Sequence, residues 1–299
     1  MIFMYNGNMR ASNNWVDYSI IASGGGEKLE KWGAVYLLRP DPQAIWKPKF
    51  DLSGFRMMHG KYTRSQSGGG AWEFYKSLPK EWVINYGKLK FLISPTNFKH
   101  TGLFPEQAVN WDKMAELING RNIRVLNLFG YTGGATVACA SASANVTHVD
   151  SSRGMMDVCK RNVELNGIPE DRVRYIVDDC MKFVLREIRR GKTYDAIIMD
   201  PPSFGRGANG EVWKIEEHLD PLVHECVKLL SDEPLFFLVN SYTTGLQPTV
   251  IKNILATNLG DEYTFGIDAF EVGLPTHEGI VLPAGCSAMA VFGRKGGRR

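Results

Sequence analysis

The sequence predicts an α/β protein, in which a small β-rich domain of residues 1–95 precedes a doubly wound parallel sheet in residues 96–299. Three observations lead to this fold class. From Val125 onward, short apolar runs alternate with amphipathic segments, which is typical of a parallel sheet covered by helices on both faces. The first 95 residues contain short strand-like runs that glycines and prolines interrupt. The composition, 44% hydrophobic and 22% charged, is that of a globular chain.

The elements of the sheet domain follow one another regularly up to Asp200. Four strands are predicted from apolar runs, at Val125–Phe129, Val146–Asp150, Val173–Asp179 and Tyr194–Asp200. The first helix between them is rich in small residues, and the next two show one apolar face each. Their residues are Ala135–Ala144, then Met155, Cys159 and Val163, and then Met181, Leu185 and Ile188.

The remaining elements complete both domains. After Asp200 we expect a helix with Leu219, Val223, Cys226 and Leu230 on one face, the strand Pro234–Ser241, the helix Leu246–Asn258, and the strands Glu262–Val272 and Ser287–Arg294. In the first domain, strands are predicted at Ala34–Leu38, Trp82–Asn85 and Phe91–Ser94. Trp111, Ala115 and Ile118 share a helical face behind Pro105, which suits a first helical turn.

Charge is unevenly distributed along the chain. Residues 1–124 carry 17 basic and 10 acidic side chains, a net of +7, whereas residues 125–299 carry 18 and 22, a net of −4. Six of the seven tryptophans also lie in the first part. A basic, aromatic-rich domain suits RNA, a polyanion with stackable bases; the alternative is a solvated surface over a small core. The predicted RNA-contact cluster is Lys47, Lys49, Arg56, Lys61 and Arg64, interleaved with Trp46, Phe50, Phe55 and Tyr62.

Cysteine usage and hydropathy exclude several classes of protein. The five cysteines are odd in number and never in CxxC spacing, which excludes a disulfide scaffold or a zinc ribbon and suits a reducing cytosol. No apolar run approaches the ~18 residues that cross a bilayer, and Met1–Arg10 lacks the apolar core of a secretory signal. We therefore expect a cytoplasmic protein without a membrane span or a metal site.

Polar features follow four consecutive strands of the predicted sheet. They are the glycine-rich loop Gly130–Gly134, Asp150, the pair Asp178-Asp179, and Asp200-Pro201-Pro202. Each has an ordinary structural reading, because glycines make turns, aspartates cap helices and prolines end strands. Ligands bind beyond the carboxyl ends of the strands in doubly wound sheets. Four such features together therefore predict a ligand site.

The loop spacing selects the ligand. A dinucleotide site needs G-x-G-x-x-G, whereas this loop reads G-x-x-G-G and no P-loop lysine follows it. S-adenosylmethionine (SAM) fits better, because it lacks phosphates and carries an amino-acid part and a ribose diol. Asp150, 16 residues after Gly134, would accept both ribose hydroxyls. Asp179 would lie near the adenine amino group, with Phe129 and Cys180 as apolar walls.

The sequence resembles the class I SAM-dependent methyltransferases, in particular the bacterial 23S rRNA methyltransferase-like group with its cytosine-C5 and guanine-N7 enzymes. The matching segments are Asn127–Gly134, His148–Ser151, Val177–Cys180, Asp200–Gly207 and Lys99–Gln107. The resemblance implies a Rossmann-like seven-stranded sheet with an antiparallel last strand, and an N-terminal region that contributes to RNA binding. It also implies that Thr101, Gly130, Thr132, Gly133, Ser151 and Asp200 belong to the cofactor site.

One departure concerns the acceptor atom. The cytosine-C5 enzymes of this group place a nucleophilic cysteine just after strand five, where this sequence has Asn240-Ser241-Tyr242. C5 of a pyrimidine is a poor nucleophile until a thiolate adds at C6, and we expect none of the five cysteines at the end of strand four or five. A base nitrogen as acceptor is therefore favoured, and the guanine-N7 relatives resemble this chain in having Asn at the position of Asn240.

The residues after strand four would then bind the target base. Asp200 and the Pro201 carbonyl would hold an amino or imino hydrogen, Phe204 would stack on a base taken out of its helix, and Arg206 would meet an RNA phosphate. For Phe204, a hydrophobic plug under the loop is the alternative. Three other functions stay open: a cytosine-C5 rRNA methyltransferase, a small-molecule methyltransferase, and a non-catalytic RNA-binding protein.

Overall fold

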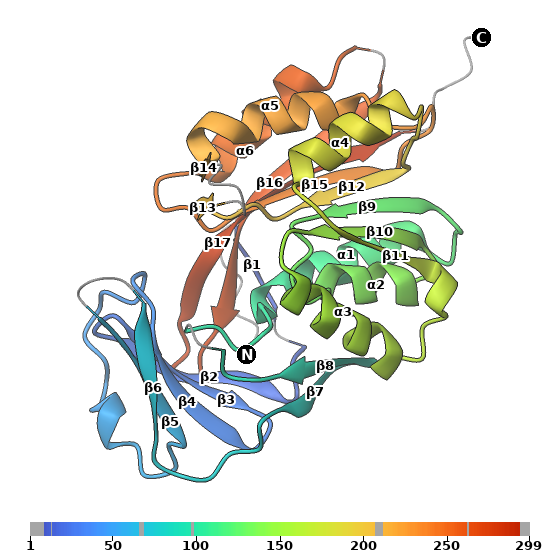
Figure 1. Ribbon diagram of the computed structural model, residues 1–299. Helices are drawn as coiled ribbons and strands as arrows, with labels where there is room; N and C mark the ends of the chain where they lie inside the picture. Colours follow the sequence, from blue (N-terminus) through green and yellow to red (C-terminus); the bar gives the residue numbers. More distant parts are fainter. Residues whose placement is uncertain are drawn as a thin grey trace. The chain divides into compact units, whose positions relative to one another are not determined.

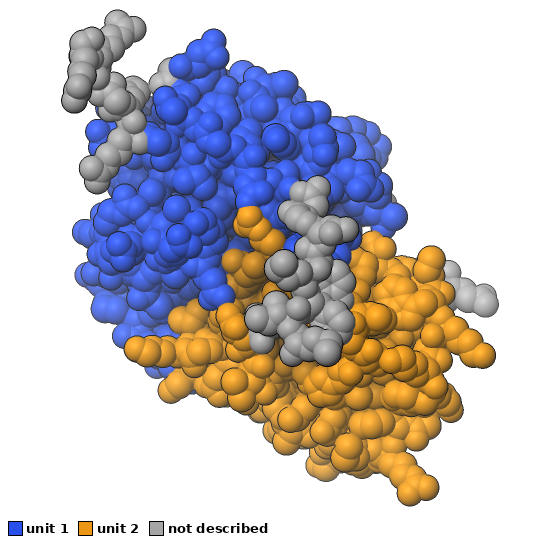
Figure 2. Space-filling model, turned by 180° about the vertical axis from the view of Figure 1, so that it is seen from behind, with its two compact units in different colours: residues 1–9, 110–271, 285–299 blue, residues 10–109, 272–284 orange. Residues whose placement is uncertain are grey.

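The computed structural model describes residues 9–12, 14–65, 69–96, 99–206, 212–261 and 263–293. The chain forms two compact units, which Figure 2 shows in different colours. Unit 1 comprises residues 1–9, 110–271 and 285–299, and unit 2 comprises residues 10–109 and 272–284. The segment 96–109 thus falls with the β-rich part, whereas the sequence predicts a boundary after residue 95.

The large sheet contains the seven predicted strands and one short strand added at its edge (Figure 1). Its order is β11-β10-β9-β12-β15-β17-β16-β1. Neighbouring strands from β11 to β15 are parallel, and β17 pairs antiparallel with β15, which confirms the predicted fold class. The bounds are β9 Arg124–Leu128, β10 Asn145–Asp150, β11 Val173–Val177, β12 Ala196–Met199, β15 Phe236–Ser241, β16 Phe265–Pro275, β17 Val281–Phe292 and β1 Met9–Ala11.

Helices cover both faces of this sheet (Figure 1). On one face lie α4, α5 and α6, and on the other lie α1, α2 and α3. This layering explains why β9 and β12 read as continuous apolar runs, since their residues are buried on both sides. The bounds are α1 Ala108–Ile118, α2 Gly134–Ser141, α3 Arg153–Leu165, α4 Cys180–Arg189, α5 Ile215–Val227 and α6 Pro248–Asn258.

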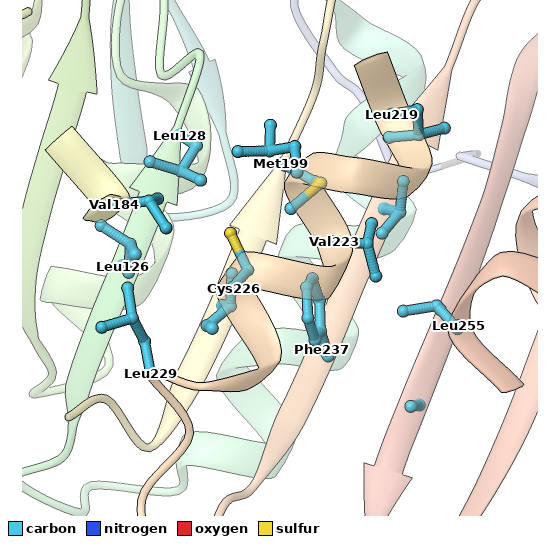
Figure 3. Packing of buried hydrophobic residues seen from close by; sticks show 14 of the residues in the cluster. Leu126, Leu128, Val184, Met199, Leu219, Val223, Cys226, Leu229, Phe237 and Leu255 are labelled. Atoms are coloured by element: carbon cyan, nitrogen blue, oxygen red, sulfur yellow. The ribbon is translucent and has the colours of Figure 1, made fainter. Parts of the chain in front are cut away.

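The main core of unit 1 lies between the sheet and α4, α5 and α6 (Figure 3). Leu126 and Phe237 of the sheet and Val223 of α5 belong to this core, and all three are fully buried. Each such side chain stabilises the fold by about 1.5–3 kcal/mol through apolar burial. On α4 the predicted face is wrong in part, because Leu185 is 37% exposed while Phe183 is fully buried.

Unit 2 is built around a five-stranded sheet of order β2-β3-β4-β5-β6. Its strands are β2 Tyr18–Gly24, β3 Glu27–Trp32, β4 Val35–Pro40, β5 Gly60–Arg64 and β6 Gly70–Phe74. A separate hairpin pairs β7 (Trp82–Tyr86) with β8 (Leu89–Ile93). A small apolar cluster around Leu29 and Leu38 covers one sheet face, so the predicted β-rich region has a core of its own.

Candidate functional site

The carboxyl ends of the parallel strands bring the predicted polar features to one edge of the large sheet. Leu128 of β9 lies in register with Val149 of β10 and with Met199 of β12. Asp150 in turn pairs with Val177 at the end of β11. The glycine-rich loop, Asp150, the Asp178-Asp179 pair and Asp200 therefore follow aligned strand ends, as the sequence predicts.

The residues Phe129–Gly133, called the cofactor loop below, adopt a conformation that sequence reasoning did not foresee. Phe129, Tyr131 and Gly133 have φ values of 55°, 52° and 88°. Glycine enters the left-handed region freely, but for Phe and Tyr this conformation costs of order 1 kcal/mol or more each. Such a loop persists only where its surroundings hold it.

Three hydrogen bonds hold the cofactor loop on the strands and helix around it. The backbone N–H of Tyr131 donates to Asp150 Oδ2 at 2.8 Å, and that of Gly130 donates to the Val149 carbonyl at 3.0 Å. Asn162 of α3, which is fully buried, donates through Nδ2 to the carbonyl of Thr132 at 2.8 Å. The loop backbone is thereby fixed by β10 and by α3.

Asp150 is half-buried at the end of β10, and its two oxygens already accept two backbone N–H groups. The second comes from Ser152, at 2.8 Å from Oδ1. Burial raises the pKa of Asp150, and these two N–H groups oppose the shift. Because each carboxylate oxygen has a second lone pair, the group keeps the capacity to accept two hydroxyls of a ribose.

The residues after β11 have structural roles in addition to the predicted ones. Asp179 is exposed and caps α4, accepting the Lys182 N–H at 2.9 Å, while Asp178 pairs with Arg186 at 2.6 Å. Cys180 is buried, and the nearby Phe129 ring is half-buried. Ser151 is exposed directly after β10.

These features fit SAM better than a phosphorylated cofactor. The cofactor loop contains no lysine or arginine, and the backbone N–H groups at the start of α2 are suited to a carboxylate. The half-buried carboxylate of Asp150 is suited to a neutral diol. The apolar side chains of Phe129 and Cys180 are suited to a flat aromatic ring.

The residues predicted to bind the target base begin at Asp200, which is half-buried directly after β12. Pro201 is buried, whereas Phe204 is 54% exposed in the short strand β13 (Phe204–Arg206), which pairs with β14 (Val212–Lys214). Its exposure argues against a hydrophobic plug. Arg206 lies on β13, but its side chain lies outside the described residues.

Trp213, the one tryptophan beyond residue 124, is a functional candidate that sequence reasoning missed. Its Nε1 donates to the Pro202 carbonyl at 2.6 Å, and its ring centroid lies 5.1 Å from that of Phe129. It therefore links the loop after β12 to the cofactor loop. Its isolation from the other six tryptophans is the sequence signal that points to it.

The residues after β15 are organised by a buried polar network. Asn240 Oδ1 accepts from Ser287 Oγ at 2.8 Å and from Asn110 Nδ2 at 3.2 Å. Ser241 pairs across strands with Cys286 of β17. One prediction therefore needs correction: Cys286 is distant in sequence from strand five, but it lies beside the carboxyl end of that strand because β17 is antiparallel.

All five cysteines are free and buried. Burial raises the pKa of each thiol, and for Cys286, where Glu271 adds to the effect, it reaches about 11. A neutral buried thiol is a small hydrophobic group rather than a nucleophile. The sequence-based reading of these cysteines as core residues agrees with their burial.

The predicted RNA-contact cluster lies in unit 2. Lys47, Lys49, Arg56 and Arg64 are exposed, whereas Lys61 is half-buried and pairs with Glu27 at 3.0 Å. Of the interleaved aromatics, Tyr62 is buried, Trp46 and Phe55 are half-buried, and Phe50 is 42% exposed. Most of these rings therefore serve the core of unit 2.

Thr101 is fully buried in unit 2, and its Oγ1 has no hydrogen-bond partner among the residues that the structure describes. The segment before it is tied to the five-stranded sheet, because Arg39 donates to the Lys99 carbonyl at 2.8 Å. Arg39 is itself held by Glu30 in a buried ion pair.

The described residues contain neither a metal-binding cluster nor a membrane-spanning helix. Within the described ranges, no group of three or more His, Cys, Asp or Glu side chains is arranged to hold a metal ion. No described helix is both long enough and apolar enough to cross a membrane.

Comparisons with known proteins agree with this geometry. A family model described as S-adenosylmethionine-dependent methyltransferase matches residues 43–214. The crystal structure of the SAM-dependent methyltransferase from Agrobacterium tumefaciens is 32% identical, with a TM-score of 0.89, and the match covers 96% of this chain and 94% of that one.

Two curated relatives are similar over part of their length. Ribosomal RNA large subunit methyltransferase K of Neisseria meningitidis serogroup B is 28% identical over 222 residues, which cover 71% of this chain and 62% of that protein. Ribosomal RNA large subunit methyltransferase I of Aeromonas hydrophila is 36% identical over 134 residues, which cover 44% and 33%. This chain thus spans less than two thirds of either relative. The family match itself covers more than half of this chain, so the chain belongs to the S-adenosylmethionine-dependent methyltransferases, and S-adenosylmethionine is its cofactor.

Proposed function

We propose that this protein methylates a base of RNA, with large-subunit (23S) ribosomal RNA as the substrate and a ring or exocyclic nitrogen as the acceptor. The observation that carries the proposal is the sheet edge of unit 1, where the cofactor loop and Asp200 follow the neighbouring strands β9 and β12. The names of the relatives from Neisseria meningitidis and Aeromonas hydrophila support ribosomal RNA as the substrate. We expect the protein in the cytoplasm, with its substrate.

The cofactor half of the site would hold SAM through neutral and polar contacts. Asp150 accepts the ribose hydroxyls, and the free oxygen of Asp179 accepts the adenine amino group. Phe129 and Cys180 flank the adenine. Gly130, Thr132, Gly133 and Ser151 line the rest of the site.

The acceptor half would position a nitrogen lone pair. SAM supplies a methyl group on a sulfonium, which such a lone pair attacks directly once it is aligned and desolvated. Asp200 accepts the hydrogen of the target amino or imino group, and the Pro201 carbonyl fixes its direction. Phe204, exposed on β13, stacks on the extruded base.

RNA would be gripped mainly through its phosphates. Lys47, Lys49, Arg56 and Arg64 are exposed and supply positive charge in unit 2, and the half-buried Lys61 adds to it. Arg206 is proposed as a further phosphate contact. Of the four interleaved aromatic rings, only Phe50 is exposed, so most of them are unavailable for stacking on RNA bases. Charge rather than base stacking therefore dominates this surface.

A cytosine-C5 mechanism is the second candidate, because Cys286 lies beside Ser241 at the end of β15. That position corresponds to the region where the cytosine-C5 relatives carry their nucleophile. The elevated pKa and burial of Cys286 disfavour it. RNA containing 5-fluorocytosine decides the matter, because a C5 enzyme forms a stable covalent adduct with it and a nitrogen methylating enzyme forms none.

The proposed function is tested in cells and with purified protein. Mass spectrometry of ribosomal RNA nucleosides from wild-type and deletion cells should show the loss of one methylated base, and the purified protein should restore it on RNA from the deletion strain. Unchanged nucleosides, together with methyl transfer to small molecules alone, would favour a small-molecule enzyme. SAM binding without any transfer would favour a non-catalytic RNA-binding protein.

A further inference from the structure

His148 lies on β10 under the cofactor loop and has no part in the chemistry proposed above. Its side chain is fully buried. The ring touches the loop backbone, since a Cβ atom built on Gly130 would lie 2.5 Å from His148 Nδ1. Gly130 is thus required by the close approach of this ring, and the ring in turn fills the space below the loop.

A chain of buried polar side chains holds the ring in place. Asn127 of β9 donates through Nδ2 to Thr136 Oγ1 at 2.9 Å, and Thr136 Oγ1 lies 2.8 Å from His148 Nδ1. The hydroxyl that accepts from Asn127 still carries a hydrogen that it can donate to Nδ1, which corresponds to the tautomer with the proton on Nε2. Cys159 Sγ lies 3.5 Å from the same Nδ1. Burial lowers the pKa of His148 to about 4, which keeps the imidazole neutral.

A proton on Nε2 would have its partner in the cofactor loop. Nε2 is buried and makes no hydrogen bond of good geometry within the described residues, while an interaction with the Tyr131 backbone raises the pKa of the ring against the effect of burial. Tyr131 is one of the two non-glycine residues of the loop in left-handed conformation. A buried N–H donor below a strained peptide can stabilise it when the loop tightens.

We propose that His148 is a positioning residue that holds the cofactor loop in its SAM-binding conformation, acting through Gly130 and Tyr131 without touching the cofactor. Its ring supports the loop sterically, and its Nε2–H donates to the Tyr131 carbonyl in the bound state. Asn127 and Thr136 form the relay that orients the ring. This inference rests on the proposed function only where turnover is measured. The Kd for SAM is measured without RNA and does not depend on the proposed substrate.

The test compares His148→Phe, His148→Gln and Thr136→Val in the full chain. Phe keeps the ring and loses both polar contacts, so the Kd for SAM measured by calorimetry should rise about tenfold, a loss typical of one buried hydrogen bond. Gln places a donor near the position of Nε2 and should restore the Kd to within about threefold of the parent. In turnover, KM for SAM should rise while kcat at saturating SAM stays within about twofold.

Thr136→Val and a control substitution separate positioning from stability. Thr136→Val should weaken SAM binding, and the double variant with His148→Phe should bind no more weakly than His148→Phe alone, because both act through one ring. Val146→Ala, a buried change on the same strand, should lower the melting temperature and leave the Kd unchanged. If His148→Phe fails to fold, the Kd for SAM of His148→Gln and of Thr136→Val still tests the proposal. An unchanged Kd for SAM in folded His148→Phe and Thr136→Val, or an equal loss of SAM affinity in Val146→Ala, would overturn the proposal. A parent protein that binds SAM but methylates no RNA would contradict only the proposed function.

Discussion

Two loops leave the same edge of the large sheet, and they are held in different ways. The cofactor loop after β9 is fixed by Asp150, by the buried Asn162 and by the ring of His148. The loop after β12 is held by contacts at the surface, such as the exposed hydrogen bond between Ser203 and Thr243. Phe204 beyond it is 54% exposed.

The proposed function accounts for this difference. A small cofactor of fixed shape is bound best by a backbone that is ordered in advance, because less entropy is lost on binding. A base within a large RNA arrives with its own backbone and neighbours, so its loop must stay accessible. Trp213 connects the two, since it contacts Phe129 on one side and Pro202 on the other.

The largest effect is expected where the cofactor loop has least space. In Gly130→Ala, the new methyl group would lie 2.5 Å from His148 Nδ1, so the ring or the loop must move. Because overpacking of this kind costs about 1–3 kcal/mol or more and falls on the loop itself, calorimetry should show SAM affinity reduced by about two orders of magnitude. Gly154→Ala on α3 is the control, since its nearest new neighbour is Ser152 Oγ at 4.0 Å. Equal affinity in the two variants would refute a preformed loop.

The second effect should separate chemistry from cofactor binding. In Asp200→Ala, the rate of methyl transfer at saturating SAM should fall roughly 10²-fold, as expected when a group that receives a proton is removed, while the Kd for SAM stays unchanged. Single-turnover assays with RNA measure the first and calorimetry the second. Glu216→Ala, which removes an exposed carboxylate on α5, is the control. A variant of Asp200 that loses SAM binding instead would move this residue to the cofactor half.

The third effect tests the other carboxylate. Asp150→Ala should weaken SAM binding by ~1.5–3 kcal/mol, since it removes charge-assisted hydrogen bonds to the ribose. The same substitution removes the acceptor of the Tyr131 N–H, so Asp150→Asn, which keeps one oxygen, should lose less. Because burial raises the pKa of Asp150, affinity should decline with acidification at a higher pH than for an exposed aspartate. NADH binding in preference to SAM would contradict the assignment.

The fourth effect concerns unit 2 and should leave the cofactor loop untouched. Replacing Lys47, Lys49, Arg56 and Arg64 by Glu should reduce RNA affinity at least about tenfold and flatten its salt dependence by roughly one log–log unit per lost contact. SAM affinity should not change. The matched charge reversal Lys252→Glu, at an exposed site on α6, should have little effect. Normal RNA binding by the fourfold variant would return the cluster to a solvated surface.

Local pattern was sufficient to predict the parallel sheet and the strand ends. The run from Val125 to Phe129 is apolar except at Asn127 because both faces of β9 are covered. The glycines that follow it indicate a turn. The aspartates at the strand ends could be found because each lies at the end of a predicted apolar strand. On α4, however, the sequence pattern favoured Leu185 over Phe183, because several apolar residues offered two possible faces and packing on the sheet selected one.

Contacts between distant residues could not be predicted. Asn162 reads as an ordinary helix residue, yet its amide binds the Thr132 carbonyl across 30 positions. Tyr131 gives no sign of a positive φ, because that conformation is imposed by its surroundings. Cys286 reaches the end of β15 only through antiparallel pairing. Each case depends on tertiary structure rather than on spacing.

The smallest effect on the rate of methyl transfer is expected from substitution of the cysteines. This prediction distinguishes a nitrogen acceptor from a pyrimidine C5 acceptor. A C5 mechanism needs a thiolate, and removing it abolishes turnover. Single Cys→Ser changes at positions 139, 159, 180, 226 and 286 should therefore each keep kcat within about threefold, when assayed below the melting temperature of the variant. Some loss of stability is expected, because a buried hydroxyl costs about 1–3 kcal/mol without a partner.

Cys286 makes this prediction a demanding one. Its Sγ donates to the Leu246 carbonyl at 3.2 Å, and a serine hydroxyl can make the same bond, so Cys286→Ser should fold. It lies beside Ser241, where a nucleophile of the C5 kind would stand. If Cys286→Ser folded, bound SAM and RNA, and yet transferred no methyl group, the acceptor would be a pyrimidine carbon, and Asp200 would serve the cofactor or the base rather than a nitrogen.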